Sequence, residues 1–272
     1  MMSQKISDHF SNVTSNIFLI SICLLLCGFI AIPLLSIFLN VDIPQVKKQL
    51  SNPEVVSALI TGLVTALVST IISMIFAIPT AYLLANRKFP GKTIIDTLLD
   101  IPMVLPPAVA GLALLLAFAP RGILGSKLSQ LGIILPGSML AVIMAQTFVA
   151  SVFTLRSSRM AFEHIDKRLI DNAKLFTNSK LRILLTVTLP LAKNGIIYGV
   201  LMTWARSMGE FGATILFAGN LPGVTQTMPL AIYTLMSEDI FASNTLSVIL
   251  ITVSFTVLII FKSFNRGEVM ES

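Results

Sequence analysis

The chain has 272 residues and a mass of 29.5 kDa, with 55% apolar residues, 12% charged residues and a mean hydropathy of +0.88. Soluble domains average about 25% charged residues, so a chain this poor in charge cannot cover a water-facing surface of its size. The composition excludes an ordinary soluble protein and points to one whose solvent is mostly lipid. The 19 basic and 13 acidic residues leave a net charge of +6, and its meaning depends on where the bases lie.

Six apolar stretches reach, or come close to, the roughly 20 residues that a helix needs to cross a hydrocarbon core of about 30 Å. In chain order they are 17–39, 55–84, 101–119, 139–155, 191–208 and 245–261. The third opens with Pro102, Pro106 and Pro107, so we expect its first turns to be bent or unwound. Asp100, just before these prolines, suits a helix N-terminus. The sequence predicts an all-α, polytopic membrane protein with six transmembrane helices.

The basic residues are divided unequally between the two sets of connecting loops. One set, which includes both termini, holds fourteen Lys and Arg residues, the other holds four, and Arg206 lies within a span. Because cytoplasmic loops are enriched in Lys and Arg, both termini are expected to be cytoplasmic. Topology thus accounts for the positive charge, and we expect no nucleic-acid partner.

Cysteine and histidine are scarce. Cys23 and Cys27 lie one helical turn apart in the first apolar stretch, and the only histidines are His9 and His164. This pattern predicts small packing residues rather than a disulfide framework, with no metal site and no cofactor.

Eight of the basic residues fall between Arg156 and Lys193, and the loop over 156–189 within this stretch has a regular pattern. Apolar side chains recur at helical spacing on one face, with charged side chains, Asp171 among them, opposite. The apolar positions are Phe162, Ile165, Leu169, Ala173 and Phe176. Such an amphipathic helix either lies flat on lipid or docks into a groove of a cytosolic partner. Acids mixed among the bases favour docking. A second helix is predicted over 180–189, capped from 177–179.

The same loop resembles a known family. The run Asp171-Asn-Ala-Lys-Leu-Phe-Thr177, followed by Leu189-Pro190, is similar to the cytoplasmic coupling loop of ABC importer permeases. The family pattern has Glu and Ala where this chain has Asp171 and Asn172, and Gly where it has Thr177. Since Gly permits a tight turn after the coupling helix, Thr177 is expected to give a different turn.

Two further runs are more specific. Trp204-Ala-Arg-Ser-Met-Gly-Glu-Phe-Gly-Ala-Thr214 and Asp100-Ile-Pro-Met-Val-Leu-Pro-Pro107 resemble the molybdate and sulfate branch of these permeases. The double proline and Thr225-Gln-Thr-Met-Pro-Leu-Ala-Ile-Tyr233 are closer to the molybdate members. The resemblance covers roughly 55–261. It implies a permease that moves a tetrahedral oxyanion, molybdate first, with sulfate/thiosulfate or tungstate as alternatives.

The resemblance also implies the organisation and partners. We expect an N-terminal part (1–54), a permease core (55–262, with the coupling loop at 156–189) and a tail (263–272). The partners would be two copies of an ATP-binding subunit, an extracytoplasmic oxyanion-binding protein and a second copy of this chain, in the cell membrane. Residues 86–93, Asn-Arg-Lys-Phe-Pro-Gly-Lys-Thr, only approximate a P-loop, because Asn86 replaces its first Gly and Pro90 intrudes. The chain is therefore expected to have no catalytic residues, with ATP hydrolysed by the partner.

An oxyanion needs a polar path through the hydrocarbon. Hydroxyl residues recur every fourth position in the second stretch, at Ser57, Thr61, Thr65, Ser69 and Ser73. They either line the path or donate to the carbonyl one turn back and ease helix packing. Both interpretations stay open, with Thr61, Thr65 and Ser69 as path candidates.

Arg206 and Glu210 lie four residues apart near the end of the fifth stretch, where an unpaired charge is costly. They form either an ion pair that fixes the bend at 209–212 or a gate element that leaves Arg206 able to attract an anion. Gly195 and Gly199 predict close helix packing, which can include a second copy of the chain. A remote alternative is an ion-coupled secondary transporter, for which Glu210 is the only intramembrane carboxylate.

Overall fold

The computed structural model describes the backbone of residues 2–41 and 43–269 and the side chains of residues 18–41 and 43–259. Within these residues every regular element is helical, which confirms the all-α prediction. In chain order the elements are α1 (Met2–Leu39), α2 (Ile43–Leu50), α3 (Pro53–Asn86), α4 (Lys92–Val104), α5 (Pro107–Phe118), α6 (Gly125–Gln130), α7 (Met139–Glu163), α8 (Lys167–Phe176), α9 (Lys180–Ile183), the π-helical turn η1 (Leu184–Thr188), α10 (Leu189–Met208), α11 (Gly212–Phe217), α12 (Met228–Met236) and α13 (Ile240–Val269).

The described residues contain five helices that are long and apolar enough to cross a membrane, and a bent pair that makes a sixth span if it is counted as one. The five are Phe18–Leu39, Pro53–Asn86, Met139–Glu163, Lys180–Met208 and Ile240–Ile259. They match five of the six predicted stretches. The long second span keeps Pro79 inside its helix.

The third predicted span, 101–119, is not one helix. Its apolar residues are divided between α4 and α5, whose axes differ by 114° across Leu105 and Pro106. Pro107 is the first residue of α5, where its missing N–H costs nothing. The placement of Asp100 before a helix was wrong: it lies inside α4, because that helix begins at Lys92, before the apolar stretch.

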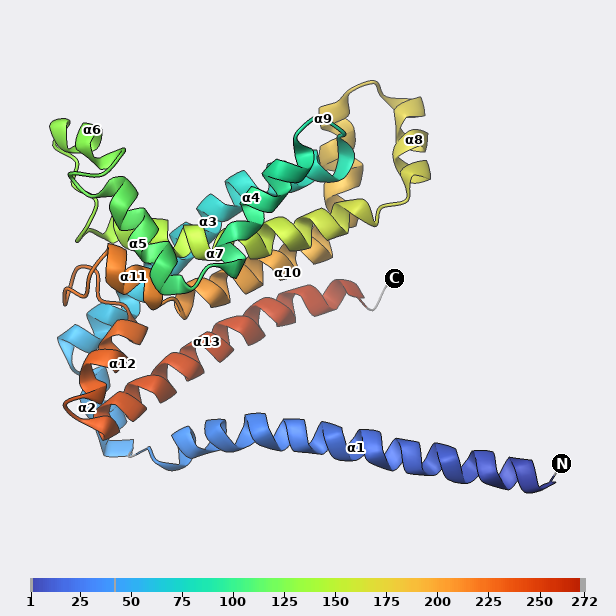
Figure 1. Ribbon diagram of the computed structural model, residues 1–272, viewed down its shortest axis with the longest axis horizontal. Helices are drawn as coiled ribbons and strands as arrows, with labels where there is room; N and C mark the ends of the chain where they lie inside the picture. The colour runs from blue at the N-terminus through green and yellow to red at the C-terminus, as the bar shows by residue number, and fades with distance from the viewer. Residues whose placement is uncertain (1, 42, 270–272) are drawn as a thin grey trace.

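Helices α3, α7 and α10 pack together at the centre of the molecule (Figure 1). The face that α3 buries is built almost wholly from small residues, which lets the helix backbones approach closely. Those residues are Ala58, Thr61, Gly62, Thr65, Ala66, Ser69, Thr70, Ser73, Ala77 and Ala81. Apolar clusters join α5 and α11 to α7, and α12 and α13 to α3.

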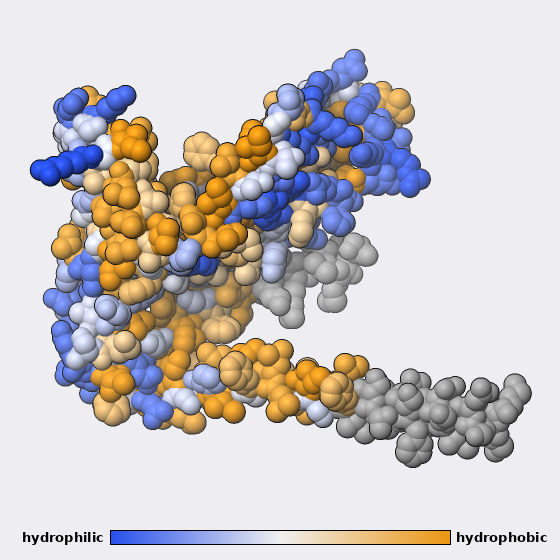
Figure 2. All heavy atoms as spheres, viewed as in Figure 1, coloured by the Kyte–Doolittle hydropathy of each residue, from blue (hydrophilic) through white to orange (hydrophobic). Residues whose placement is uncertain are grey.

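Helix α1 stands apart from this bundle and meets it only near its C-terminal end (Figure 1). None of the residues of its span, all of them described, is buried. The Asn244 amide of α13 donates to the backbone oxygens of Ile37 and Asn40, at 3.0 and 3.1 Å. These bonds fasten the end of α1, while its apolar side chains stay uncovered, as Figure 2 shows.

Polar residues gather at the two ends of the molecule in Figure 2, around α8 and α9 at one end and around α2 and α6 at the other. The N-terminal end of α1 and the C-terminal end of α13 lie toward the side of α8 (Figure 1). Helix α13 runs to Val269, past the predicted start of a separate tail at residue 263, and residues 270–272 lie outside the described part.

The helix predicted over 180–189 does not stop before Pro190. Residues Lys180–Met208 form one continuous helical span through α9, η1 and α10. A proline inside an α-helix clashes with the carbonyl four residues earlier and removes one hydrogen bond. The π-helical turn over Leu184–Thr188 widens the helix directly before Pro190 and accommodates this loss.

Candidate functional site

The fifth span ends at a backbone break inside the molecule. Helix α10 ends at Met208, and α11 begins only at Gly212. A Cβ atom on Gly212 would lie 2.8 Å from Cβ of Pro107, a distance that side chains do not tolerate. Gly212 is therefore required so that the start of α11 can rest on the start of α5.

The predicted ion pair of Arg206 and Glu210 lies at this break. Arg206 Nη2 is 2.6 Å from Glu210 Oε2, and the Glu210 side chain is 1% exposed. The second carboxylate oxygen, Oε1, accepts a hydrogen bond of 2.7 Å from the backbone N–H of Ala213 in the first turn of α11. A carboxylate at that position complements the positive end of the helix. Glu210 thus holds together α10, the break and α11, while Arg206 keeps 29% of its side chain exposed.

Gln146 is a residue of the site that sequence reasoning missed. It lies on α7, is 1% exposed, and its Nε2 donates to the carbonyl oxygen of Ser207 at 3.1 Å. That carbonyl belongs to the last turn of α10 and also accepts from the N–H of Glu210 at 3.2 Å. The available signal was a lone amide within the apolar stretch 139–155. Gln146 fastens the broken end of the fifth span to the fourth.

The hydroxyl row of α3 lies inside the bundle. Thr61, Thr65, Ser69 and Ser73 are each at most 4% exposed. Thr65 Oγ1 donates to the Thr61 carbonyl at 2.7 Å, and Ser73 Oγ to the Ser69 carbonyl at 2.7 Å. Ser69 also pairs with the Ser207 hydroxyl of α10 at 3.0 Å. This geometry is that of the packing interpretation, and it gives the path interpretation no direct support.

Gly195 and Gly199 lie on α10 against α7 of the same chain. A Cβ on Gly195 would lie 2.5 Å from Cβ of Ala161, and one on Gly199 would lie 2.8 Å from Cβ of Ser157. The Ser157 hydroxyl donates to the Gly195 carbonyl at 2.6 Å. The close packing that this spacing predicts is therefore within one chain.

Residues 162–176, which were predicted to form one amphipathic helix, are divided between two helices. Helix α7 continues to Glu163, and α8 begins at Lys167, with Asp166 as its N-cap. Phe162 is 3% exposed, and its ring lies edge-on to that of Tyr82 at 5.5 Å between centroids. Ile165 packs against the same cluster. Phe162 is thus part of the interior, and Ile165 is half-buried beside it, so neither continues an exposed apolar face of α8. Helical spacing alone could not show where one helix ends and the next begins.

The remaining predicted docking residues lie on α8. Along this helix, which is described in full, none of the residues is buried. Leu169 is 47% exposed and Phe176 is 89% exposed. Ala173 lies between them, and Asp171 pairs with Lys174 at 2.7 Å. Leu175, which the predicted face omitted, is 81% exposed.

The turn after α8 differs from a glycine turn, as Thr177 led us to expect. Thr177 has extended backbone angles, φ −158° and ψ 138°. Its Oγ1 accepts from the N–H of Ser179 at 3.2 Å, and the Ser179 hydroxyl in turn accepts from the N–H of Arg182 and caps α9. Two hydroxyl caps thus take the place of the glycine that would adopt a left-handed backbone conformation at this turn.

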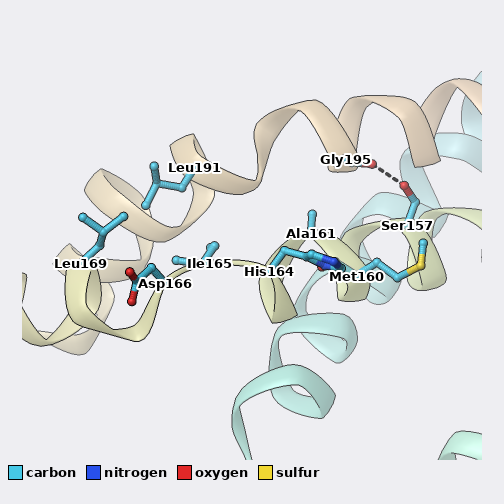
Figure 3. A pocket seen from close by; sticks show the side chains of 9 residues that line it. All are labelled: Ser157, Met160, Ala161, His164, Ile165, Asp166, Leu169, Leu191 and Gly195. Carbon is cyan, nitrogen blue, oxygen red and sulfur yellow. Dashed lines mark hydrogen bonds between the residues drawn. The ribbon is translucent and has the colours of Figure 1, made fainter. Parts of the chain in front are cut away.

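A cavity of about 450 Å³ lies between α7, α8 and α10 (Figure 3). Leu169 of α8 and Leu191 of α10 line it on one side, and Met160 of α7 and His164, directly after α7, on the other. Helix α8 is therefore held away from the bundle and joined to it mainly through its two ends. The described residues contain no group of three or more His, Cys, Asp or Glu that could hold a metal ion.

Comparison with known proteins decides the family. Residues 77–267 match the family model described as "Binding-protein-dependent transport system inner membrane component". The chain belongs to this family of ABC importer permeases. The matched residues include the break at Arg206 and Glu210 and the whole of α8, whereas the α3 positions Thr61, Thr65 and Ser69 lie before them.

Two relatives resemble the permease over most of its length. It is 36% identical to the molybdenum transport system permease protein ModB of Mycobacterium bovis over 231 residues, which are 85% of this chain and 88% of the relative. It is 32% identical to the molybdate/tungstate transport system permease protein WtpB of Thermococcus kodakarensis over 239 residues, 87% and 90% of the two chains.

A solved structure shares the permease's fold. It is a bacterial ABC transporter that imports the acidic polysaccharide alginate, with a TM-score of 0.79 and 13% identity. The match covers 95% of this chain and 98% of the other. Because the identity is low, this likeness speaks for the fold alone.

Proposed function

We propose that this chain is the membrane-spanning subunit of an ABC importer that moves molybdate into the cytoplasm. The observation that carries the proposal is the likeness to the ModB permease of Mycobacterium bovis, which spans nearly the whole of both chains. Tungstate is the second candidate, since the similarly covered WtpB relative is a molybdate/tungstate permease. Sulfate/thiosulfate remains the alternative that the sequence pattern raised.

Energy for transport would come from a separate ATP-binding subunit, two copies of which would face two copies of this chain. The exposure of α8 supports this arrangement, because Leu169, Leu175 and Phe176 lie bare on a helix beyond the bundle. An apolar helix face of this kind is stable when it lies in a groove of another protein. The other expected partner is an extracytoplasmic protein that delivers the anion, as the family's description implies.

The orientation follows from charge. The basic side chains of α8 and α9 and of the turn between α3 and α4 would mark the cytoplasmic side, as would the excess of fourteen bases over four. Both termini would then lie in the cytoplasm and α2, α6 and α12 outside it. In the cell membrane the uncovered surface of α1 would contact lipid or the second copy of the chain.

Within the membrane, Arg206 and Glu210 are our candidates for the gate. Arg206 is a partly exposed cation at a break between two helices, and such breaks place polar groups at membrane depth. The ion pair with Glu210 keeps the site near neutral overall, so an anion would be held weakly enough to be released.

The experiment is ATP-dependent uptake of radiolabelled molybdate into liposomes. They would contain the permease, its partner ATPase and the binding protein. We expect uptake that requires ATP and that tungstate inhibits more strongly than sulfate does. Uptake driven by a proton or sodium gradient in vesicles without the ATPase would support the secondary transporter and refute the proposal. Uptake of sulfate but not of molybdate would refute the choice of anion.

A further inference from the structure

Four charged residues join α4 to α7 near the α8 end of the bundle, and the function proposed above uses none of them. Asp96 and Asp100 lie one turn apart on α4, and Arg156 and Arg159 lie one turn apart on α7. Arg156 binds both oxygens of the Asp100 carboxylate and lies 3.1 Å, through Nη1, from Asp96 Oδ1. Arg159 also pairs with Asp96. We call these four residues the ion-pair ladder.

The ladder is the most specific attachment of α4 to the rest of the molecule. None of the residues of α4, all of which are described, is buried. Beneath the helix, toward α3 and α7, lies a mostly apolar cavity of about 310 Å³ lined in part by Phe76, Leu98 and Phe148. Apolar packing therefore leaves α4 loosely held. Bidentate Arg–carboxylate pairs fix both the distance and the orientation of the two helices.

Helix α5, the other half of the bent span, is held in the opposite way. A Cβ atom on Gly111 would lie 2.7 Å from the Ala213 carbonyl oxygen of α11. At the start of α5, Pro107 rests on Gly212. Close backbone contact thus joins α5 to α11, and the N–H of Ala213 is bonded to Glu210. A displacement of α4 would reach the Arg206–Glu210 break through the prolines of the bend.

The α7 end of the ladder is adjacent to α8. Arg159 Nε bonds Glu163 Oε1 at 2.8 Å, and Glu163 is the last residue of α7. Only residues 164–166 separate it from α8. Movement of α8 would therefore act on this end of α7 through the short connection, and on α9 and η1 through direct contact.

We propose that Asp96, Asp100, Arg156 and Arg159 are positioning residues of the transport cycle. They keep α4 moving with the α8 end of α7, so that a displacement of α8 by the ATPase is transmitted through the bend at Pro106 and Pro107 to the break at Gly212. The proposal rests on the function proposed above. Without the ladder, ATP would still be hydrolysed, but its hydrolysis would no longer change the conformation at the break between α10 and α11.

The first test measures molybdate transported per ATP hydrolysed by the reconstituted complex. The variants are Asp100→Asn, Arg156→Gln and the double variant, with Arg156→Lys as the conservative change. The control is Lys92→Gln, which removes a charge from the same helix at a position in no ion pair among the described residues. We expect each single change to lower the ratio about tenfold, a usual size for coupling between sites.

The pattern across variants separates positioning from simple stabilisation. The double variant should be no worse than the worse single variant, Arg156→Lys should recover part of the ratio, and Lys92→Gln should match the unaltered complex. A ratio that is unchanged in all variants would overturn the proposal, as would a double variant whose loss is the product of the two single losses.

The second test does not depend on which anion is carried. Spin labels at positions 97 on α4 and 160 on α7, both exposed, report the separation of the two helices with Cys23 and Cys27 replaced by Ser. We expect the separation to be the same in the nucleotide-free and ATP-bound complexes, and to change with nucleotide in the Asp100→Asn complex. A separation that changes with nucleotide in the unaltered complex would refute the ladder. A complex that passes this test but transports no molybdate would refute the proposed function instead.

Discussion

The central bundle and helix α8 differ in how much of their apolar surface the chain itself covers. Helix α3 packs into the bundle through a face of mostly small residues, and the Ser69 hydroxyl and the Gln146 amide nitrogen find partners on α10. On α8 the large apolar side chains are bare and the ion pairs are exposed. The bundle is thus covered by contacts within the chain, whereas the apolar surface of α8 is the one that the proposed ATPase would cover. Substitutions should therefore affect stability in the first region and assembly in the second.

The largest loss of stability is expected at the broken span. Glu210→Ala removes the partner of Arg206 and the acceptor for the Ala213 N–H from a buried position. Breaking a buried ion pair from one side costs about 3–5 kcal/mol, and the partial exposure of Arg206 places the effect at the lower limit. Thermal unfolding of the purified permease in detergent measures it. Glu210→Gln, which keeps an acceptor for Ala213, should lose less; equal melting temperatures for both variants and the unaltered chain would contradict the ion-pair role.

A smaller loss should follow from disturbing the contact of α10 with α7. Gly199→Val places new atoms within about 3 Å of Ser157 and of the α7 backbone, and overpacking of this kind costs about 1–3 kcal/mol. Gly28→Val on α1 is the matched control, since no atom lies within 4 Å of its added Cβ. The same thermal assay compares the two. Equal unfolding temperatures would show that this glycine step is not needed for packing.

The interhelical hydroxyl bonds should each contribute less again. Thr154 Oγ1 lies 2.7 Å from the hydroxyl of Thr203, across the α7–α10 contact. Hydrogen bonds between membrane helices average about 0.6 kcal/mol, so Thr154→Val should lower stability by about that amount. Thr256→Val, which removes an exposed hydroxyl that bonds within α13, should change nothing measurable. A loss above about 2 kcal/mol would point to a larger polar network than these bonds.

The smallest effect on stability, and the sharpest on assembly, is expected on α8. Phe176 is 89% exposed, so Phe176→Ala should leave the free energy of unfolding within about 0.5 kcal/mol of that of the unaltered chain. The same change should weaken co-purification of the ATPase, because an aromatic anchor of the docking face is lost. Leu131→Ala, at a side chain 76% exposed at the far end of the molecule, should leave ATPase binding intact. An ATPase that binds the Phe176→Ala permease normally would remove α8 as its docking site.

The sequence indicated what depends on apolar length and on residues close together in the chain. Five spans follow from runs of apolar residues, and the Arg206–Glu210 pair follows from a spacing of four residues. The extent of the second loop helix could not be predicted, because the π-helical turn that carries it past Pro190 has no simple sequence signal.

Contacts between distant residues could not be predicted from one sequence. Gln146 reaches Ser207 across 61 positions, and Arg156 reaches Asp100 across 56. Phe162 fits the helical spacing of the predicted docking face but is buried against Tyr82. Periodicity shows which side chains share one face of a helix, but not what packs against that face. The ion-pair ladder joins charges that the sequence placed in two different loops.

The unbroken helix over Lys180–Met208 also bears on where α8 lies relative to lipid. Its 29 residues measure about 43 Å at about 1.5 Å per residue, which exceeds a hydrocarbon thickness of about 30 Å. The Met208 end is anchored within the bundle by Gln146, so the surplus belongs at the Lys180 end. If this helix stands upright in the membrane, we expect it to hold the bare apolar surface of α8 beyond the acyl chains, where a soluble protein can cover it.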